Sequence, residues 1–360
     1  MLIYPTFKMA PIQGLTGFGG GATGYLVSGG AGGITQWSSS NFPPADSGDS
    51  NVQMDVVSGH PNILQIYYST TVSLSSNSGT TNSGAQHSCV LNFDFTGYGI
   101  TNVTFYGIGP GGGGNTGPCS NGSGGGGGAF KIVCPAGDSR LSSVTLRTGF
   151  RGRGGYQQSG RSFASGPPYG VADGAYAGGQ TRVTFSNGTY IYANGGDAGV
   201  NDNCSSVGSG GGNGYGGTAS FSGQVPGSVD TFSGGAGAYS GHSGNTGGNA
   251  AFPGGYISGS ATAGGGGSSG YYTNISGYWG IGGKGCSITS NAGTTGANTS
   301  GSYNTPSENI IGCNLFSGDA NGFGGGGGNI ETDGSSSGGT GDYAGYAGHG
   351  GMGAIWIELT

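Results

Sequence analysis

Charged side chains are scarce in this chain. Lys and Arg number 9 and Asp and Glu number 15 among 360 residues, and Lys284 is the only basic residue after Arg182. The net charge of −6 argues against nucleic acid as a partner, because binding to phosphates depends on clustered Lys and Arg. A surface that relies on Asn, Ser, Thr and Gly for solubility is typical of an extracellular or particle-bound structural protein.

Long hydrophobic runs are missing as well. No apolar stretch approaches the ~20 residues that a membrane-spanning helix needs. Residues Met1 to Lys8 lack the basic and apolar regions of a signal peptide. We therefore expect an external protein without an export signal, as a virion component released by lysis would be.

The residues that carry enzymatic chemistry are few and scattered. The histidines stand alone, without zinc-ligand spacing or a nucleophile elbow: His60, His87, His242 and His349. Glycoside hydrolysis needs two carboxylates about 5–9 Å apart, and the close pairs in sequence are Asp197 with Asp202 and Glu331 with Asp333. Such a pair is typical of a solvated loop or, with backbone carbonyls added, of a calcium site. We expect no enzyme activity, no cofactor and no metal, with calcium as the alternative.

The six cysteines contain no CxxC pair, which argues against metal ligation: Cys89, Cys119, Cys134, Cys204, Cys286 and Cys313. Cys286 and Cys313 bracket a polar, nearly uncharged segment, and a disulfide between them would close a long loop. The alternative is that the cysteines are buried free thiols.

Proline is scarce, at 13 residues, whereas glycine is abundant, at 93. Collagen is excluded, because it needs an unbroken Gly-X-Y period and Pro near a fifth of all residues. Glycine nevertheless recurs at every third position in short runs, which are Gly208, Gly211, Gly214 and Gly217; Gly241, Gly244 and Gly247; Gly264, Gly267 and Gly270; Gly277, Gly280 and Gly283; and Gly345, Gly348 and Gly351.

A period of three matches the left-handed helix with three residues per turn, which makes no internal hydrogen bonds. Because glycine has no Cβ, several such helices can approach closely and pair their backbone groups laterally. The runs therefore predict a polyglycine-II helix bundle over residues 195–352. Disorder is the competing interpretation of a Gly/Ser-rich chain, but 20 Tyr, 15 Phe and 3 Trp provide more apolar surface than a flexible linker needs.

Strands are predicted before Gly195 by alternating β-branched and aromatic residues, over 51–57, 62–75, 88–95, 100–108, 129–134 and 143–148. The Asn187-Gly188 pair within residues 183–192 predicts a β-hairpin. After Gly195 the only strand we expect is 353–360, whose apolar residues, Trp356 among them, require burial against the earlier strands.

We expect three regions. Residues 1–90 form an N-terminal attachment or assembly region with strands, 91–194 form a β-rich domain closed by strand 353–360, and 195–352 form the helix bundle with variable loops. The predicted fold class is β-rich with an irregular, left-handed three-fold polyglycine-II bundle and essentially no α-helix.

Two further motifs are weaker. Gly17-x-Gly19-x-x-Ala22 matches the dinucleotide fingerprint, but no helix-forming run follows it. The segment RTGFRGRGGYQQSGR holds a basic cluster that is similar to an RGG nucleic-acid segment: Arg147, Arg151, Arg153 and Arg161. The low overall positive charge favours a structural or anionic-glycan role for this cluster.

The order of these elements resembles a known family. A strand VTFYGIG, a glycine tract, a second strand, a hairpin ending in ANGG, broken glycine repeats and a closing GHGGMGAIWIEL are together similar to the glycine-rich domain of bacteriophage tail fibres. The resemblance covers residues 91–360 and extends to the tail-fibre or tail-tip adhesins of T-even-like phages. It implies that glycine-helix bundles present variable loops to a host surface.

The resemblance implies that receptor-binding residues lie in the segments between glycine runs, over 218–233, 268–279 and 287–320. The candidates there are aromatic: Phe221, Phe232, Tyr271, Tyr272, Tyr278 and Trp279. Exposed aromatic side chains offer a large contact area at low entropy cost. The alternative is that they only cover the ends of the bundle, and for Trp356, inside a strand, we favour a structural role.

The function that we expect is a phage virion protein, non-catalytic, that binds a host cell-surface receptor, either a glycan or an outer-membrane protein. Its expected partners are other tail proteins and further copies of itself, with a trimer by analogy to fibres, and neither nucleic acid nor a membrane. The alternative is a purely structural virion decoration, fibre or extracellular filament subunit. An enzyme that degrades a host polysaccharide is the third hypothesis.

Overall fold

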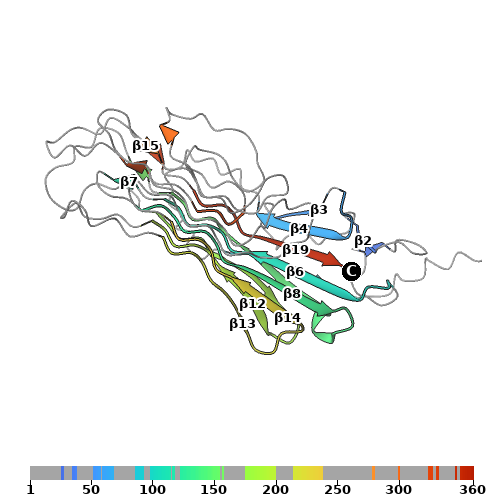
Figure 1. Ribbon diagram of the computed structural model, residues 1–360. Coiled ribbons are helices and arrows are strands. Elements are labelled where there is room, and N and C mark those ends of the chain that lie inside the picture. The colour runs from blue at the N-terminus through green and yellow to red at the C-terminus, as the bar shows by residue number, and fades with distance from the viewer. Residues whose placement is uncertain are drawn as a thin grey trace, which may run out of the picture.

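Most of the regular structure lies in two large antiparallel sheets (Figure 1), and several of their strands alternate buried and partly exposed residues. A computed structural model of the chain describes residues 26–27, 35–38, 52–57, 59–68, 86–92, 98–114, 116–117, 122–154, 156–157, 175–199, 214–237, 278–279, 299–300, 323–326, 330–331, 345–346 and 349–360. Two very short strands near the N-terminus, β1 (Leu26–Val27) and β2 (Gln36–Trp37), pair with each other.

The first large sheet has six strands in the order β14-β8-β6-β19-β4-β3. Their bounds are β3 Val52–Val56, β4 Ile63–Tyr68, β6 Asn102–Ile108, β8 Ala129–Pro135, β14 Ser228–Phe232 and β19 Ala354–Leu359. Strands from both sides of the expected boundary at residue 90 therefore lie in one sheet. The C-terminal β19 lies between β6 and β4, so the expected pairing of the closing strand with earlier strands is confirmed.

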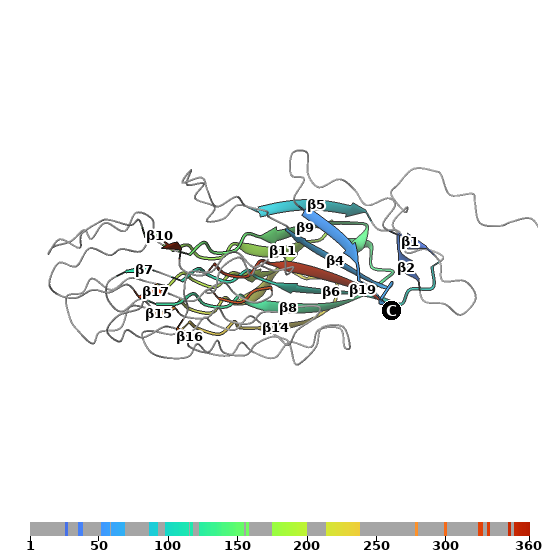
Figure 2. The same cartoon turned by 90° about the horizontal axis from the view of Figure 1, so that it is seen from above.

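The second large sheet has five strands in the order β13-β12-β11-β9-β5. Their bounds are β5 Gln86–Asn92, β9 Ser143–Gly149, β11 Gln180–Thr184, β12 Tyr190–Asn194 and β13 Ala219–Ser222. Figure 2, turned by 90°, shows β5, β9 and β11 as a layer beside the layer that holds β6, β8 and β19.

The core fills the space between these two layers. Phe105 and Ile355 of the first sheet are fully buried, as are Val183 and Ile191 of the second. Phe185 meets Phe105 across the interface in an edge-on ring contact, with centroids 6.0 Å apart. Each such side chain contributes about 1.5–3 kcal/mol through removal from water.

The predicted strands and the near absence of α-helix are confirmed within the described residues, where the only helical element is the single 3₁₀ turn η2, Ser139–Leu141. The predicted hairpin is also confirmed, as β11 and β12 pair in antiparallel register. Gly188 N donates to Phe185 O, and Gly188 has φ of 80°. Glycine occupies this left-handed position at little cost, which explains the Asn-Gly signal.

The expectation of no strands between Gly195 and the C-terminal strand is wrong. Segment 218–233, expected to be a recognition loop, contains β13 and β14. β13 is an edge strand of the five-stranded sheet, and β14 is an edge strand of the six-stranded sheet. Both strands are short and their residues are largely exposed, so they lack the buried alternating face that makes a strand visible in sequence. Gly223, with φ of 75°, lies in the connection between them.

Trp356 has the structural role that its position predicts. It is fully buried in β19, and its indole Nε1 donates to Gln65 Oε1 at 2.9 Å. Phe323 packs edge-on against its ring, with centroids 5.5 Å apart. The buried polar atom is thus satisfied, as the burial of an indole N–H requires.

Glycine-rich chain segments, most of which continue from the ends of the sheet strands, bond to one another. We call these the glycine segments: 109–114, 122–128, 150–154, 175–179, 195–199, 214–217, 233–237, 323–326 and 349–353. Most of their backbone N–H donors bond to carbonyl oxygens of neighbouring glycine segments, a few, such as Gly128 and Gly353, bond to strand residues, and none of these bonds lies within one segment. Every such bond is lateral, so each segment depends on its neighbours to satisfy its polar groups.

The direction of these bonds repeats every three residues. In segment 122–128, three consecutive donors reach three different segments, and the fourth donates to Asn194, the last residue of β12, which directly precedes the first of those segments. The donors and acceptors, at 2.7–3.0 Å, are Gly125 to Asp197, Gly126 to Gly235, Gly127 to Gly324 and Gly128 to Asn194. Donors three residues apart in this segment therefore bond to the same neighbouring stretch of chain.

The glycine period noted in the sequence agrees with this arrangement where it is described. Gly214 N donates to Ser123 O at 3.0 Å, and Gly217 N donates to Gly126 O at 2.7 Å, so residues three apart face the same neighbour. The other glycines proposed as structural lie outside the described residues: Gly208, Gly211, Gly241, Gly244, Gly247, Gly277, Gly280 and Gly283.

The glycine segments leave no space for side chains at their contacts. A Cβ added to Gly111 would overlap the carbonyl oxygen of Gly325, and one added to Gly127 would overlap the carbonyl oxygen of Gly109. The obstacle in each case is backbone, which cannot rotate away as a flexible side chain can. These positions therefore require glycine for close approach.

We predict that Gly111→Ala destabilises the fold by about 1–3 kcal/mol, the usual cost of overpacking, because the new methyl group meets a fixed carbonyl. The matched control is Gly137→Ala, in the turn after β8, where an added Cβ meets nothing within 4 Å. Chemical denaturation of the two variants measures the difference. Equal free energies of unfolding for both variants would contradict the close packing of the glycine segments.

Candidate functional site

Short strands gather at the end of the glycine segments that is remote from the C-terminus, as Figures 1 and 2 both show. We call this region the short-strand end. Its strands are β7 Thr116–Gly117, β10 Tyr156–Gln157, β15 Tyr278–Trp279, β16 Thr299–Ser300, β17 Ile330–Glu331 and β18 Gly345–Tyr346. They come from segments that are widely separated in sequence.

Pairing joins these strands into two small sheets. One has the order β16-β15-β17-β7, with β17 and β7 parallel, and the other is the antiparallel pair of β10 and β18. Because each strand has only two residues, its hydrogen bonds alone cannot hold it in place. Glycine segments 109–114 and 150–154 lead toward β7 and β10, and segment 349–353 follows shortly after β18.

Two of the predicted receptor-binding residues lie at the short-strand end. Tyr278 is directly opposite Ser300 on one side and Glu331 on the other. Trp279, the next residue of β15, is opposite Thr299 and Ile330. The backbone thus brings aromatic, hydroxyl and carboxylate residues from three separate segments into neighbouring positions. Tyr271 and Tyr272 lie outside the described residues.

The register also brings together two tyrosines that the sequence did not single out. Tyr156 of β10 is opposite Tyr346 of β18. Tyr156 directly follows an Arg-Gly segment and Tyr346 lies in a period-three glycine run, and neither context signals a strand. Only the pairing of distant segments reveals them as neighbours.

Phe221 and Phe232 do not join this group, since they lie in β13 and β14 at the edges of the large sheets. Phe221 is 49% exposed and is opposite Ile191, whereas Phe232 is half-buried and opposite Ala129. Tyr215, which precedes β13, is more exposed still, at 74%. The predicted aromatic residues therefore belong to two separate regions.

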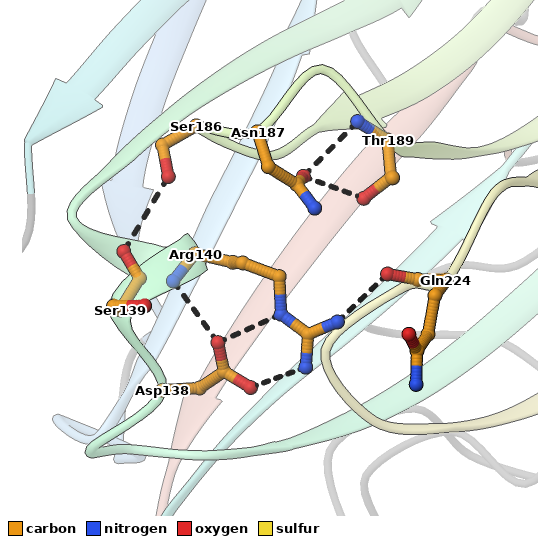
Figure 3. Close-up of polar contacts among 7 residues, drawn as sticks. All are labelled: Asp138, Ser139, Arg140, Ser186, Asn187, Thr189 and Gln224. Carbon is orange, nitrogen blue, oxygen red and sulfur yellow. Dashed lines mark hydrogen bonds and ion pairs between the residues drawn. The ribbon is translucent and has the colours of Figure 1, made fainter.

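The turn between β13 and β14 is tied to two other turns, as Figure 3 shows. Arg140 donates from Nη1 to Gln224 O at 2.7 Å and forms an ion pair with Asp138, with Nη2 and Oδ2 2.6 Å apart. Ser186 Oγ donates to Ser139 O at 3.4 Å. Hydrogen bonds from Arg140 lower the pKa of Asp138. These contacts make segment 218–233 a fixed part of the sheet scaffold.

The carboxylates considered for catalysis or calcium are only partly described. Asp197 lies in a glycine segment, where its backbone O accepts from Gly125 N at 2.9 Å. Asp202 and Asp333 lie outside the described residues. Within the described part of the chain, no group of three His, Cys, Asp or Glu residues is placed to hold a metal ion.

Cys134 is a buried free thiol, the alternative that the sequence left open for the cysteines. Burial, and secondarily the charge of Asp138, raises the pKa of this thiol to about 12. It is therefore protonated and a poor nucleophile. The proposed pair of Cys286 and Cys313 lies outside the described residues.

His349 is a buried titratable group among the glycine segments. Its Nδ1 accepts a hydrogen bond from Gly154 N at 2.8 Å. Burial lowers the pKa of His349 well below its usual value, and the charges of Arg151 and Arg153 lower it further. The imidazole is therefore neutral at pH 7, with a packing role in this position.

We predict that His349 makes the fold less stable in acid. His349 takes up a proton near pH 6.5 in the unfolded chain but not in the folded chain. The free energy of unfolding therefore falls by about 1.4 kcal/mol per pH unit as the pH drops below about 6.5. Thermal unfolding of the wild type and of His349→Gln between pH 8 and pH 5 measures the effect. The wild type should lose stability more steeply, and parallel pH profiles would contradict the prediction.

No helix in the described part of the chain is long and apolar enough to cross a membrane. Comparison of the sequence with models of known protein families and with curated proteins finds no match.

Proposed function

We propose that the glycine segments are polyglycine-II helices packed as a bundle. The proposal is supported by the lateral direction of their hydrogen bonds, by the return of each bond direction after three residues, and by the absence of space for a Cβ at their contacts. These properties distinguish the segments from β-strands, in which successive polar groups alternate between only two directions.

The bundle extends the two sheets and carries the short-strand end. Rigid elements position recognition residues better than free loops do, because less conformational entropy is lost on binding. Loops held at such an end can differ in sequence without disturbing the scaffold, since the lateral backbone bonds do not involve their side chains.

On this basis the protein is a tail-fibre or tail-tip component of a bacteriophage virion that binds a host cell-surface receptor without catalysis. The observation that carries the proposal is that aromatic residues lie in both small sheets of the short-strand end, Tyr278 and Trp279 in one and Tyr156 opposite Tyr346 in the other. Aromatic residues are frequent among those that dominate the binding energy of interfaces. The net charge of −6 and the extracellular type of composition are consistent with this role.

We predict that the double substitution Tyr278→Ser and Trp279→Ser lowers adsorption to the host by about tenfold or more, because central aromatic residues typically dominate such contacts. Adsorption of particles carrying the variant, to the bacterial strain on which they grow, measures the effect. Thermal unfolding should remain close to that of the wild type.

The matched control is Phe221→Ser, which removes an exposed aromatic side chain at the sheet edge. The proposal requires this variant to adsorb normally. Loss of adsorption in the control alone would place recognition on segment 218–233 instead. Normal adsorption by particles that lack the whole protein would favour the purely structural alternative.

A further inference from the structure

The outer face of the five-stranded sheet combines arginine and tyrosine residues at neighbouring positions. In β11 and β12 the buried residues alternate with Arg182, Tyr190 and Tyr192, which are partly exposed on the opposite face. Arg147 of β9 lies directly opposite Arg182, and Arg182 lies directly opposite Tyr192. We call Arg147, Arg182, Tyr190 and Tyr192 the Arg–Tyr face.

This face has positive charge in a protein that is acidic overall. None of the five strands β5, β9, β11, β12 and β13 contains an Asp or Glu residue. Like charges at directly opposed positions of an antiparallel pair are destabilising. Burial lowers the pKa of Arg182 and the charge of Arg147 lowers it further, although Arg182 remains charged.

Arg182 is held in one orientation. Its guanidinium lies over the ring of Tyr190, 3.5 Å from the centroid, and its Nε donates to Thr184 Oγ1 at 3.0 Å. No hydrogen bond joins its two terminal amino groups to another group of the described residues. Those donors form the planar fork that binds a carboxylate in a bidentate manner, with little further loss of side-chain entropy.

The tyrosines provide a polar and apolar surface beside these donors. The ring centroids of Tyr190 and Tyr192 are 5.9 Å apart, and the two ring planes are tilted by 42° relative to each other. A row of hydrogen-bonded polar side chains continues the face, with Gln180 Nε2 donating to Asn194 Oδ1 at 3.0 Å and Asn194 Nδ2 donating to Thr218 Oγ1 at 3.3 Å. Exposed Ser220 and Ser222 border it on β13.

We propose that the Arg–Tyr face binds an acidic polysaccharide whose sugars carry carboxylates. The Arg182 guanidinium would bind a carboxylate, and the tyrosine rings and polar row would contact the sugar rings and hydroxyls. A nucleic acid fits less well, since its uniform phosphate charge calls for many more Lys and Arg than this chain has. The face lies on the sheet, so the site is additional to the receptor-binding end and does not depend on it.

The test is binding of polygalacturonate to the intact protein at physiological ionic strength, with neutral dextran as the comparison. The wild type should bind polygalacturonate and not dextran. Arg182→Gln should weaken binding about tenfold, the usual scale for a charge-assisted hydrogen bond. Tyr192→Thr, which keeps a β-favouring residue in β12, should weaken binding as well.

The matched control is Lys131→Gln, which removes one positive charge from β8 of the other sheet. It should bind like the wild type, as should the double variant at Tyr278 and Trp279. Absence of binding by the wild type, an equal loss in Lys131→Gln, or tighter binding of an oligothymidine than of polygalacturonate would overturn the proposal. Thermal unfolding of each variant confirms that the sheet is intact.

Discussion

The structure depends on direct contact between backbones at positions that have no Cβ. A methyl group at Gly111, Gly127 or Gly196 would occupy the space of a carbonyl oxygen on a neighbouring segment. Glycine loses more conformational entropy on folding than any other residue, about 0.5–1 kcal/mol relative to Ala in regular structure. Lateral hydrogen bonds from several neighbours to each segment offset that loss only when all the segments are assembled. The glycine segments are therefore cooperative, and no single one is expected to be stable alone.

The two sheets set the arrangement of the glycine segments. Segment 109–114 follows β6, segment 122–128 precedes β8, and segment 349–353 precedes β19, so three adjacent strands of one sheet lead directly into glycine segments. The hydrophobic core between the sheets fixes the strands, and the strands fix the starting positions of the segments. Recognition at the short-strand end would then combine a stable scaffold with residues whose amino-acid type the scaffold does not restrict. The Arg–Tyr face would give the five-stranded sheet a binding role in addition to this positioning role.

The sequence predicted the parts of this structure that follow from local patterns. Alternation identified residues 102–108, a short apolar run identified residues 354–359, and Asn187-Gly188 identified the hairpin. It missed β13 and β14, because these edge strands are largely exposed and so show no alternation of buried apolar and exposed polar residues. The pairing of Arg147 with Arg182 depends on strand register between distant segments, as does that of Tyr156 with Tyr346, and neither leaves a local pattern. The period of three was visible near Gly214 and Gly217 but hidden in 122–128, where consecutive glycines conceal which residues face which neighbour.

Backbone amide hydrogen exchange of the glycine segments tests the central claim most directly. Gly125, Gly126 and Gly127 donate to three different segments, whereas Gly137 lies in an open turn with space around it. If lateral bonding holds the segments together, the first three amides should exchange as slowly as that of Phe105 in the buried strand β6, because all open only through cooperative unfolding. Exchange of these three amides as fast as that of Gly137, with Phe105 still protected, would contradict the account.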